Sequence, residues 1–174
     1  PRCVRTITAG ELETAAPLGD PITAERWMSV QAMALTAVAA DLAGVMAGAL
    51  DDAVRYAGER VQFGVKIGTF QAVSQRLADG YIDVLGQRLT LWSAAWRLAE
   101  GLPSETEVAI AKLWAADAAH RLAHTTVHVH GGVGIDLDGE AHRYFTTAKR
   151  LEFAFGGTTE QALAIGRVLA AEPA

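Results

Sequence analysis

Residues 32–50 read AMALTAVAADLAGVMAGAL, a stretch of 19 residues in which Asp41 is the only charged side chain. Its length alone would also fit a membrane-spanning helix. The central aspartate and the weakly hydrophobic alanines argue against insertion, since a charge at the centre of a span costs about 2.5–3.5 kcal/mol. A helix that is apolar on most sides is also typical of one surrounded by other helices. We therefore expect the central helix of a bundle and no membrane contact.

Few helix breakers interrupt the chain around this stretch. Prolines stand at positions 1, 17, 21, 103 and 173 only, which permits long helices. Hydrophobic spacing and end signals predict helices at about 23–57, 70–100, 104–130, 139–150 and 158–171. The pairs Ser104 with Glu107 and Thr158 with Gln161 have capping-box spacing, and Asp138 is the expected N-cap of the short helix. The pattern predicts an all-α, up-and-down four-helix bundle over residues 21–174.

The first 20 residues differ from the rest. Val4, Thr6 and Thr8 alternate with polar residues, and Pro17-Leu18-Gly19-Asp20-Pro21 favours a turn. Residues 1–20 are therefore predicted to be a tail and linker, the end of a preceding β-domain.

Composition narrows the class of protein. The 174 residues have a net charge of −5, which argues against a nucleic-acid partner or an anionic membrane surface. Disorder is excluded because 51% of the residues are apolar. The lone Cys3 has no internal disulfide partner, and no signal peptide is visible, so we expect a cytoplasmic setting.

Three glycine-containing segments stand at predicted helix ends, where backbone N–H groups are free and an anionic ligand can approach the main chain. They are Arg60-Val61-Gln62-Phe63-Gly64 with Ile67 and Phe70-Gln71, then His128-Val129-His130-Gly131-Gly132-Val133-Gly134, then Phe155-Gly156-Gly157-Thr158-Thr159-Glu160. The planar guanidinium of Arg60 suits a diphosphate. Each segment alone also fits a plain structural role, with Gly131 and Gly156 as helix C-caps and Arg60 as a surface charge.

Taken in this order and spacing, the segments resemble the C-terminal helical domain of the acyl-CoA dehydrogenase family. That family has an R-x-Q-F-G-x-x-I-x-x-F-Q stretch, a Q-x-H-G-G-x-G turn and an aromatic-x-G-T segment. The resemblance covers roughly residues 22–172 and implies an FAD cofactor shared across a subunit interface. It assigns candidate cofactor contacts to Arg60, Phe63, Gln71, His128, Gly131, Gly132 and Thr158.

The sequence departs from the family pattern at the catalytic base. The usual Glu of the aromatic-E-G-T segment is Gly156, and the alternative base position in the first helix is Ala34. Glu25 or Glu160 would substitute only with a different geometry, so the catalytic residue stays unassigned. The family Gln before H-G-G is His128, the Gln after G-T is Glu160, and the Arg of the fourth helix is Thr146.

Two further groups have simpler interpretations. His120, His124 and His128 recur every four residues, which would suit zinc or nickel, but we interpret them as a polar helix face and predict no metal site. Trp92, Trp96 and Trp114 are expected to pack in the core or at an interface.

The resemblance implies a domain that supplies FAD contacts and oligomer contacts for α,β-dehydrogenation of an acyl-CoA thioester. The resemblance also implies a homo- or hetero-oligomer, a dimer or tetramer, with an electron-transfer acceptor as a further partner. The absent Glu favours the role of a non-catalytic partner subunit in a hetero-oligomer. One alternative is a helical assembly module that has lost flavin chemistry. Another is a helical metal-binding protein that uses the three histidines.

Overall fold

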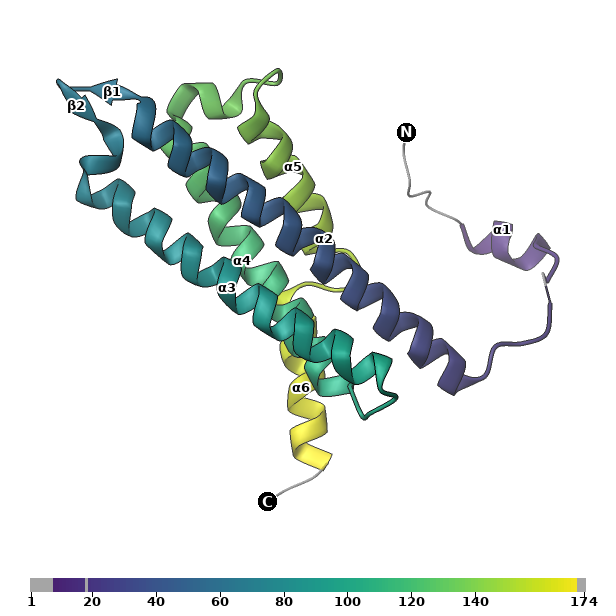
Figure 1. Cartoon of the computed structure of the whole chain (residues 1–174). Helices are drawn as coiled ribbons and strands as arrows, with labels where there is room; N and C mark the ends of the chain where they lie inside the picture. Colours follow the sequence, from purple (N-terminus) through teal and green to yellow (C-terminus); the bar gives the residue numbers. More distant parts are fainter. Residues whose placement is uncertain (1–7, 18, 172–174) are drawn as a thin grey trace.

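The computed structural model describes residues 8–17 and 19–171, and this part of the chain is almost entirely helical (Figure 1). Its elements in order are α1 Ala9–Thr14, α2 Ala24–Glu59, β1 Val61–Gln62, β2 Val65–Lys66, the 3₁₀ helix η1 Ile67–Thr69, α3 Gln71–Ala99, α4 Glu105–His130, the 3₁₀ helix η2 Gly131–Ile135, α5 Glu140–Glu152 and α6 Thr158–Ala171. The predicted all-α bundle of long helices is confirmed.

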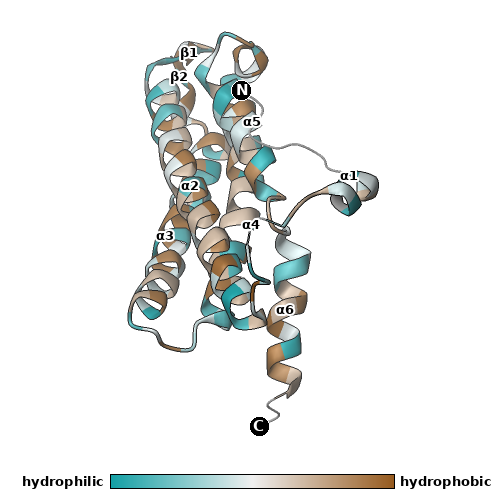
Figure 2. Ribbon diagram, turned by 90° about the vertical axis from the view of Figure 1, so that its right-hand side faces the viewer, coloured by the Kyte–Doolittle hydropathy of each residue, from teal (hydrophilic) through white to brown (hydrophobic). Residues whose placement is uncertain are grey.

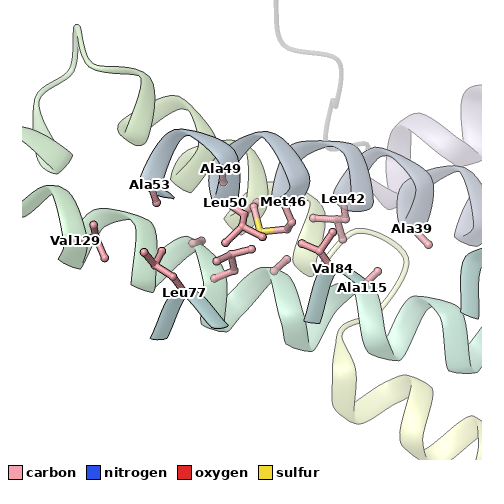
Figure 3. Close-up of a cluster of buried hydrophobic side chains, with 14 of the residues drawn as sticks. Ala39, Leu42, Met46, Ala49, Leu50, Ala53, Leu77, Val84, Ala115 and Val129 are labelled. Carbon is pink, nitrogen blue, oxygen red and sulfur yellow. The ribbon is translucent and has the colours of Figure 1, made fainter. Parts of the chain in front are cut away.

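Helix α4 is the hub of the bundle, because it packs against α2, α3, α5 and α6. Its buried face is built mainly from alanines, such as Ala115, Ala119 and Ala123, which let neighbouring helices approach closely. The core between α2, α3 and α4 is filled by larger side chains, including Leu42, Met46 and Leu122 (Figure 3). The longest apolar run in the sequence therefore lies beside the central helix rather than within it.

Helix α2 is the one helix in the described residues that is long and apolar enough to cross a membrane, and 44% of its apolar window is buried. It starts as predicted, because the Thr23 hydroxyl accepts the Arg26 N–H at 3.3 Å. Leu42 and Met46 are fully buried against the other helices. Its contacts are those of a core helix in a bundle.

The segment before α2 contains a short helix that the sequence did not predict. Thr8 and Glu11 cap α1 reciprocally: the Glu11 carboxylate accepts the Thr8 N–H at 2.9 Å, and the Thr8 hydroxyl accepts the Glu11 N–H at 3.3 Å. α1 stands apart from the bundle in Figure 1. The predicted strand involves residues 4–8, of which 4–7 lie outside the described part of the chain.

The predicted capping box of α4 is wrong, although the helix starts where expected. Ser104 is the N-cap residue, but its side chain makes no capping hydrogen bond, and its φ of −135° and ψ of 1° differ from the usual extended cap. Glu107 instead pairs with Arg97 at 3.1 Å, and Arg97 also donates to the Pro103 carbonyl at 2.9 Å. The Glu107 side chain, which local spacing assigned to the cap, is therefore held in an ion pair with a residue of α3.

The next two caps are each shifted by one residue from their predicted positions. The N-cap of α5 is Gly139 rather than Asp138, whose N–H donates to the Asp136 carboxylate at 3.1 Å. α6 begins at Thr158 itself, so its capping carboxylate is Glu160 rather than the Gln161 side chain. Gly131 is a C-cap as expected, whereas the C-cap of α5 is Phe153 and not Gly156.

Helix α3 carries hydrophobic residues at intervals along its length (Figure 2), and some of them are buried while others are exposed. Leu77 and Val84 belong to the core, but Leu89, Trp92 and Trp96 are 72%, 68% and 57% exposed. Trp114 is half-buried and lies against Gly86, where an added Cβ would come within 2.6 Å of the indole. Trp114 therefore packs inside the bundle, and Trp92 and Trp96 do not.

Candidate functional site

The first predicted loop is a β-hairpin that follows directly from the end of α2. Val61 pairs with Lys66 and Gln62 with Val65 in antiparallel register. Arg60 closes the base of this hairpin, because its carbonyl accepts the Ile67 N–H at 2.9 Å while its own N–H donates to the Tyr56 carbonyl at 2.8 Å. The backbone of Arg60 is thus fixed on both sides.

The tip of the hairpin presents an aromatic ring to solvent. Phe63 and Gly64 have φ values of 53° and 80°, and a two-residue hairpin loop with two positive φ angles is a type I′ turn. Positive φ is unfavourable for phenylalanine, yet Phe63 is 93% exposed, and its ring lies edge-on to Phe70 with 6.2 Å between ring centroids. A strained and exposed aromatic residue is typical of a site that meets another molecule.

Arg60 and Gln71 flank the hairpin and its 3₁₀ helix, and both side chains are exposed. Arg60 forms no ion pair with any residue that the structure describes, so its five N–H donors are free for a ligand. Gln71 is the first residue of α3. The two polar side chains therefore stand at one end of the bundle.

The glycine turn after α4 lies at the same end of the bundle (Figure 1). Position 131 requires glycine because its φ is 64°. Position 134 requires glycine because a Cβ there would lie 2.6 Å from the Val127 carbonyl oxygen. Gly132 has neither constraint: a Cβ there would meet no atom within 4 Å. Its main chain faces open space, as approach of a bulky ligand requires. His128, on the last turn of α4, is exposed.

These groups fit one part of a dinucleotide such as FAD. A free guanidinium and an open glycine turn are the donors that a diphosphate and its sugar use. They line an exposed end rather than an enclosed cavity, so a second surface is needed to complete the site. Thr158 belongs to a different place: its segment is tied to Lys112, 18 residues before His130 on α4 and therefore about 27 Å away along the helix. The fold of one chain therefore places six of the predicted contacts at one end of the bundle and Thr158 away from them. The six are Arg60, Phe63, Gln71, His128, Gly131 and Gly132.

The α5–α6 connection, where the family has its catalytic Glu, is held from inside the protein by Lys112. This lysine is fully buried, and its ammonium donates to the carbonyls of Glu152 and Gly156, each at 2.9 Å. Burial lowers the pKa of Lys112, and the charges of Glu152 and Glu160 partly oppose that shift. A charged side chain on the hub helix thus fixes both ends of the connection.

Helix α6 fastens the same connection from the other side. The Gln161 amide donates to the Phe155 carbonyl at 3.3 Å, and the Glu160 carboxylate accepts the Gly157 N–H at 3.0 Å. Gly156 has a φ of 95°, and a Cβ on it would lie 3.0 Å from the Gln161 amide nitrogen. The position is therefore built around glycine, and a side chain there would be strained and crowded.

Gly156 also lines a cavity of about 540 Å³ between α2, the α3–α4 turn and α6. Glu160 contributes to the lining, but its carboxylate is bound to the Gly157 N–H. Glu25 and Ala34, the other positions considered for a base, lie on α2 outside this lining. None of these three residues presents a free carboxylate to the cavity.

The three histidines are not gathered into one cluster in the described part of the chain. His120 Nδ1 lies 3.0 Å from the Glu152 carboxylate, and the His120 and His124 rings are 4.9 Å apart. Burial, with the charges of His120 and Lys149, lowers the pKa of His124. No group of three metal-ligating side chains occurs within the described ranges.

Comparison with known proteins decides the family. Residues 27–170 match the family described as "Acyl-CoA dehydrogenase, C-terminal domain". The chain belongs to the acyl-CoA dehydrogenase family. It is the C-terminal domain of this fold, and members of the family are FAD-dependent oxidoreductases.

Two relatives and one solved complex show how far the likeness extends. Acyl-CoA dehydrogenase FadE27 of Mycobacterium tuberculosis is 56% identical over 139 residues, which are 75% of this chain and 37% of that protein. The ChsE4-ChsE5 complex from Mycobacterium tuberculosis contains a chain that is 52% identical, with a TM-score of 0.85, over 87% of this chain and 41% of that one. Butyryl-CoA dehydrogenase from Megasphaera elsdenii is 32% identical, with a TM-score of 0.80, over 84% of this chain and 38% of that one. The chain thus spans about two fifths of the length of these proteins.

Sequence reasoning missed Lys112 altogether. The one signal was its place within Ala109-Ile110-Ala111-Lys112-Leu113-Trp114-Ala115-Ala116, an apolar helical run in which a lysine is out of place. A buried lysine needs partners, but the sequence does not say which, because the carbonyls that it binds lie 40 and 44 residues away.

Proposed function

We propose that this chain is the C-terminal domain of an acyl-CoA dehydrogenase subunit, and that its hairpin end supplies contacts to an FAD held together with a second chain. The supporting observation is that a free Arg60 and an open Gly132 backbone stand at the same end of the bundle, without internal partners. Neither feature improves the packing of the domain itself.

Within this proposal the residues of the chain bind and orient, while the cofactor accepts the hydride that leaves the β-carbon of an acyl-CoA thioester. Arg60 binds the diphosphate through its planar fork. Gln71 and the Gly131–Gly132 backbone bind the adenosine portion, with His128 beside them. Phe63 covers the cofactor at the chain boundary. Thr158, at the other end, contacts a second copy of the cofactor.

We propose further that the subunit does not supply the catalytic base. Gly156 has no side chain to accept a proton, and its positive φ and crowded surroundings disfavour a glutamate there. The base would come from a sister chain in a hetero-oligomer. A similar chain is found in the complex named ChsE4-ChsE5, which agrees with such an assembly.

The outward face of α3 suits the oligomer contact. Leu89, Trp92 and Trp96 follow one another at helical spacing on its exposed side. Large aromatic residues are enriched at the centres of protein interfaces. We propose that a second chain covers this face, that the assembly passes electrons to a separate acceptor, and that it works in the cytoplasm.

The experiment uses the full-length protein that contains this chain, purified alone and together with its partner chain. We expect FAD to copurify with the assembly, and an artificial electron acceptor to be reduced with acyl-CoA only when the partner is present. Oxidation of acyl-CoA by the single subunit would refute the non-catalytic role. A stable oligomer with no visible flavin absorbance and no thermal shift with FAD would instead establish an assembly module without flavin chemistry.

A further inference from the structure

The last residue of α4, His130, occupies a buried polar cluster behind the glycine turn. Its Nδ1 lies 2.8 Å from the Thr126 carbonyl oxygen, and its Nε2 lies 3.1 Å from the Asp52 carboxylate. The ring also stacks on Tyr56, with 4.3 Å between centroids. Only 7% of the His130 side chain and 8% of the Asp52 side chain are exposed.

The contacts define the direction of each interaction. A carbonyl oxygen only accepts, so Nδ1 must hold a proton and donate it to Thr126. This leaves Nε2 as the nitrogen that faces Asp52. The other carboxylate oxygen of Asp52 accepts from Arg55, one turn further along α2. The imidazole therefore connects the main chain of α4 to a charged pair on α2.

The same cluster touches both segments that we assign to the cofactor. Tyr56 is one turn before Arg60, and its carbonyl accepts the Arg60 N–H. The Tyr56 hydroxyl also points to the His130 carbonyl, at 3.5 Å. His130 directly precedes Gly131 and Gly132. No other described polar cluster links the end of α2 to the end of α4.

Stability alone is a poor reason for this arrangement. Removing charges from water offsets much of their attraction, so a buried ion pair stabilises a fold little better than apolar side chains of the same size. A ring such as phenylalanine would fill the place of His130 and still stack on Tyr56. Unlike phenylalanine, histidine also provides directional polar contacts between α4 and α2, and these contacts fix the register of the two helices.

We propose that His130 is a positioning residue for the cofactor. Together with Asp52 and Tyr56, it holds the Arg60 end of α2 and the Gly131–Gly132 turn at the spacing that the diphosphate and adenosine of FAD require. The inference rests on the proposed FAD contacts of this end. His130 and Asp52 are both buried, so they would act on the cofactor through the segments that they connect.

The test uses the full-length protein with its partner chain, stripped of FAD and titrated with FAD. His130→Phe keeps the stacking on Tyr56 but breaks the link to Asp52, and Asp52→Leu breaks it from the other side, because leucine has neither donor nor acceptor atoms. We expect each variant to bind FAD about tenfold more weakly, since residues that act through others change ligand affinity within this range. The double variant should bind no more weakly than either single one, because all three lose the same link.

Two readouts separate positioning from general damage. The flavin absorbance of the loaded variants should equal that of the unmodified protein, because the cluster supports the adenosine end and not the flavin ring. Leucine is close to aspartate in shape, so Asp52→Leu keeps the fold measurable by thermal unfolding if His130→Phe does not. Unchanged FAD affinity in Asp52→Leu would overturn the inference, as would additive losses in the double variant. If Arg60→Ala also leaves FAD affinity unchanged, the proposed function itself fails.

Discussion

The hairpin end and the α5–α6 connection are both glycine-containing segments from family motifs, yet they are built in opposite ways. At the hairpin end, Arg60 has no ion pair among the described residues, and a Cβ on Gly132 would meet open space. In the α5–α6 connection, Gly156 is crowded, and its carbonyl is bound by the buried Lys112. The first segment is left open toward something outside the chain, and the second is satisfied from within.

Under the proposed function, this difference would allow the hairpin end to bind a cofactor while the α5–α6 connection supplies no catalytic base. Open donors and an exposed glycine turn cost the fold little and remain available to a ligand. In the α5–α6 connection, the Phe155 and Gly156 carbonyls and the Gly157 N–H are bound by side chains of α4 and α6, which leaves little freedom for a catalytic side chain there. The comparison also predicts that mutations in the closed segment change stability, whereas mutations in the open segment change binding.

Lys112→Met should give the largest effect on stability. It keeps the length of the side chain but leaves the Glu152 and Gly156 carbonyls without their donor, which should destabilise the protein by about 2–4 kcal/mol. Chemical denaturation measures the loss. Lys66→Met, at an exposed position of β2, is the control and should be nearly neutral. If both lysines prove equally dispensable, the ammonium does not hold the connection.

Arg60→Ala should change binding with little change in stability. Loss of a charge-assisted contact to a phosphate should weaken FAD binding by about 10–100-fold. The free energy of unfolding should change by less than about 0.5 kcal/mol, since the side chain has no internal partner. Arg150→Ala removes a similarly exposed arginine from α5 and should leave FAD affinity unchanged. Equal effects of the two substitutions would indicate a general charge effect and not a site.

Gly156→Ala should destabilise the protein by about 1–3 kcal/mol, because alanine is disfavoured at a φ of 95° and its Cβ would crowd Gln161. Gly166→Ala is a matched control within α6, where a Cβ meets no atom within 4 Å. That control should be neutral or stabilising, since alanine favours the helix. Thermal unfolding of both variants measures the contrast, and a tolerated Gly156→Ala would show that the connection can accept a side chain.

Phe63→Asn should stabilise the hairpin while weakening its binding role. Asparagine accepts positive φ more readily than phenylalanine, so we expect a gain of about 0.5–1 kcal/mol. FAD affinity, or assembly with the partner chain, should fall because the exposed ring is lost. Phe153→Asn replaces an exposed phenylalanine with a φ of −95° and should bring no such gain. If Phe63→Asn destabilises the chain, the ring serves the hairpin rather than an external contact.

The smallest expected effect is on how the free energy of unfolding depends on pH. Burial lowers the pKa of folded Lys112 below its ordinary value of 10.5, so in the alkaline range beneath 10.5 the unfolded chain binds a proton that the folded chain releases. The difference in free energy of unfolding between the unmodified protein and Lys112→Met should therefore rise with pH through that range. It should level off at higher pH. Denaturation at a series of pH values measures this difference. A flat difference would mean that the lysine is not buried in solution.

Helix positions could be predicted from sequence because they depend on neighbours along the chain. The proline-free segments and the hydrophobic spacing placed α2, α3, α4 and α6 within a few residues of their observed ends. The caps were less predictable. Ser104 was assigned a cap that Arg97 prevents by binding Glu107, and no local rule contains Arg97. The hairpin at Arg60 was expected only as a loop, because Phe-Gly is not a typical type I′ pair.

The sequence by itself determined the class of fold, the family and which segments are candidates for cofactor contact, since these follow from residue types at short spacings. Only the tertiary structure decided which of those segments are open and which are closed. Lys112 meets the α5–α6 connection, and Asp52 meets His130, across separations of 40 residues or more. The free energy of a buried polar group depends on the partner it finds in space, and that partner is fixed only when the helices have packed.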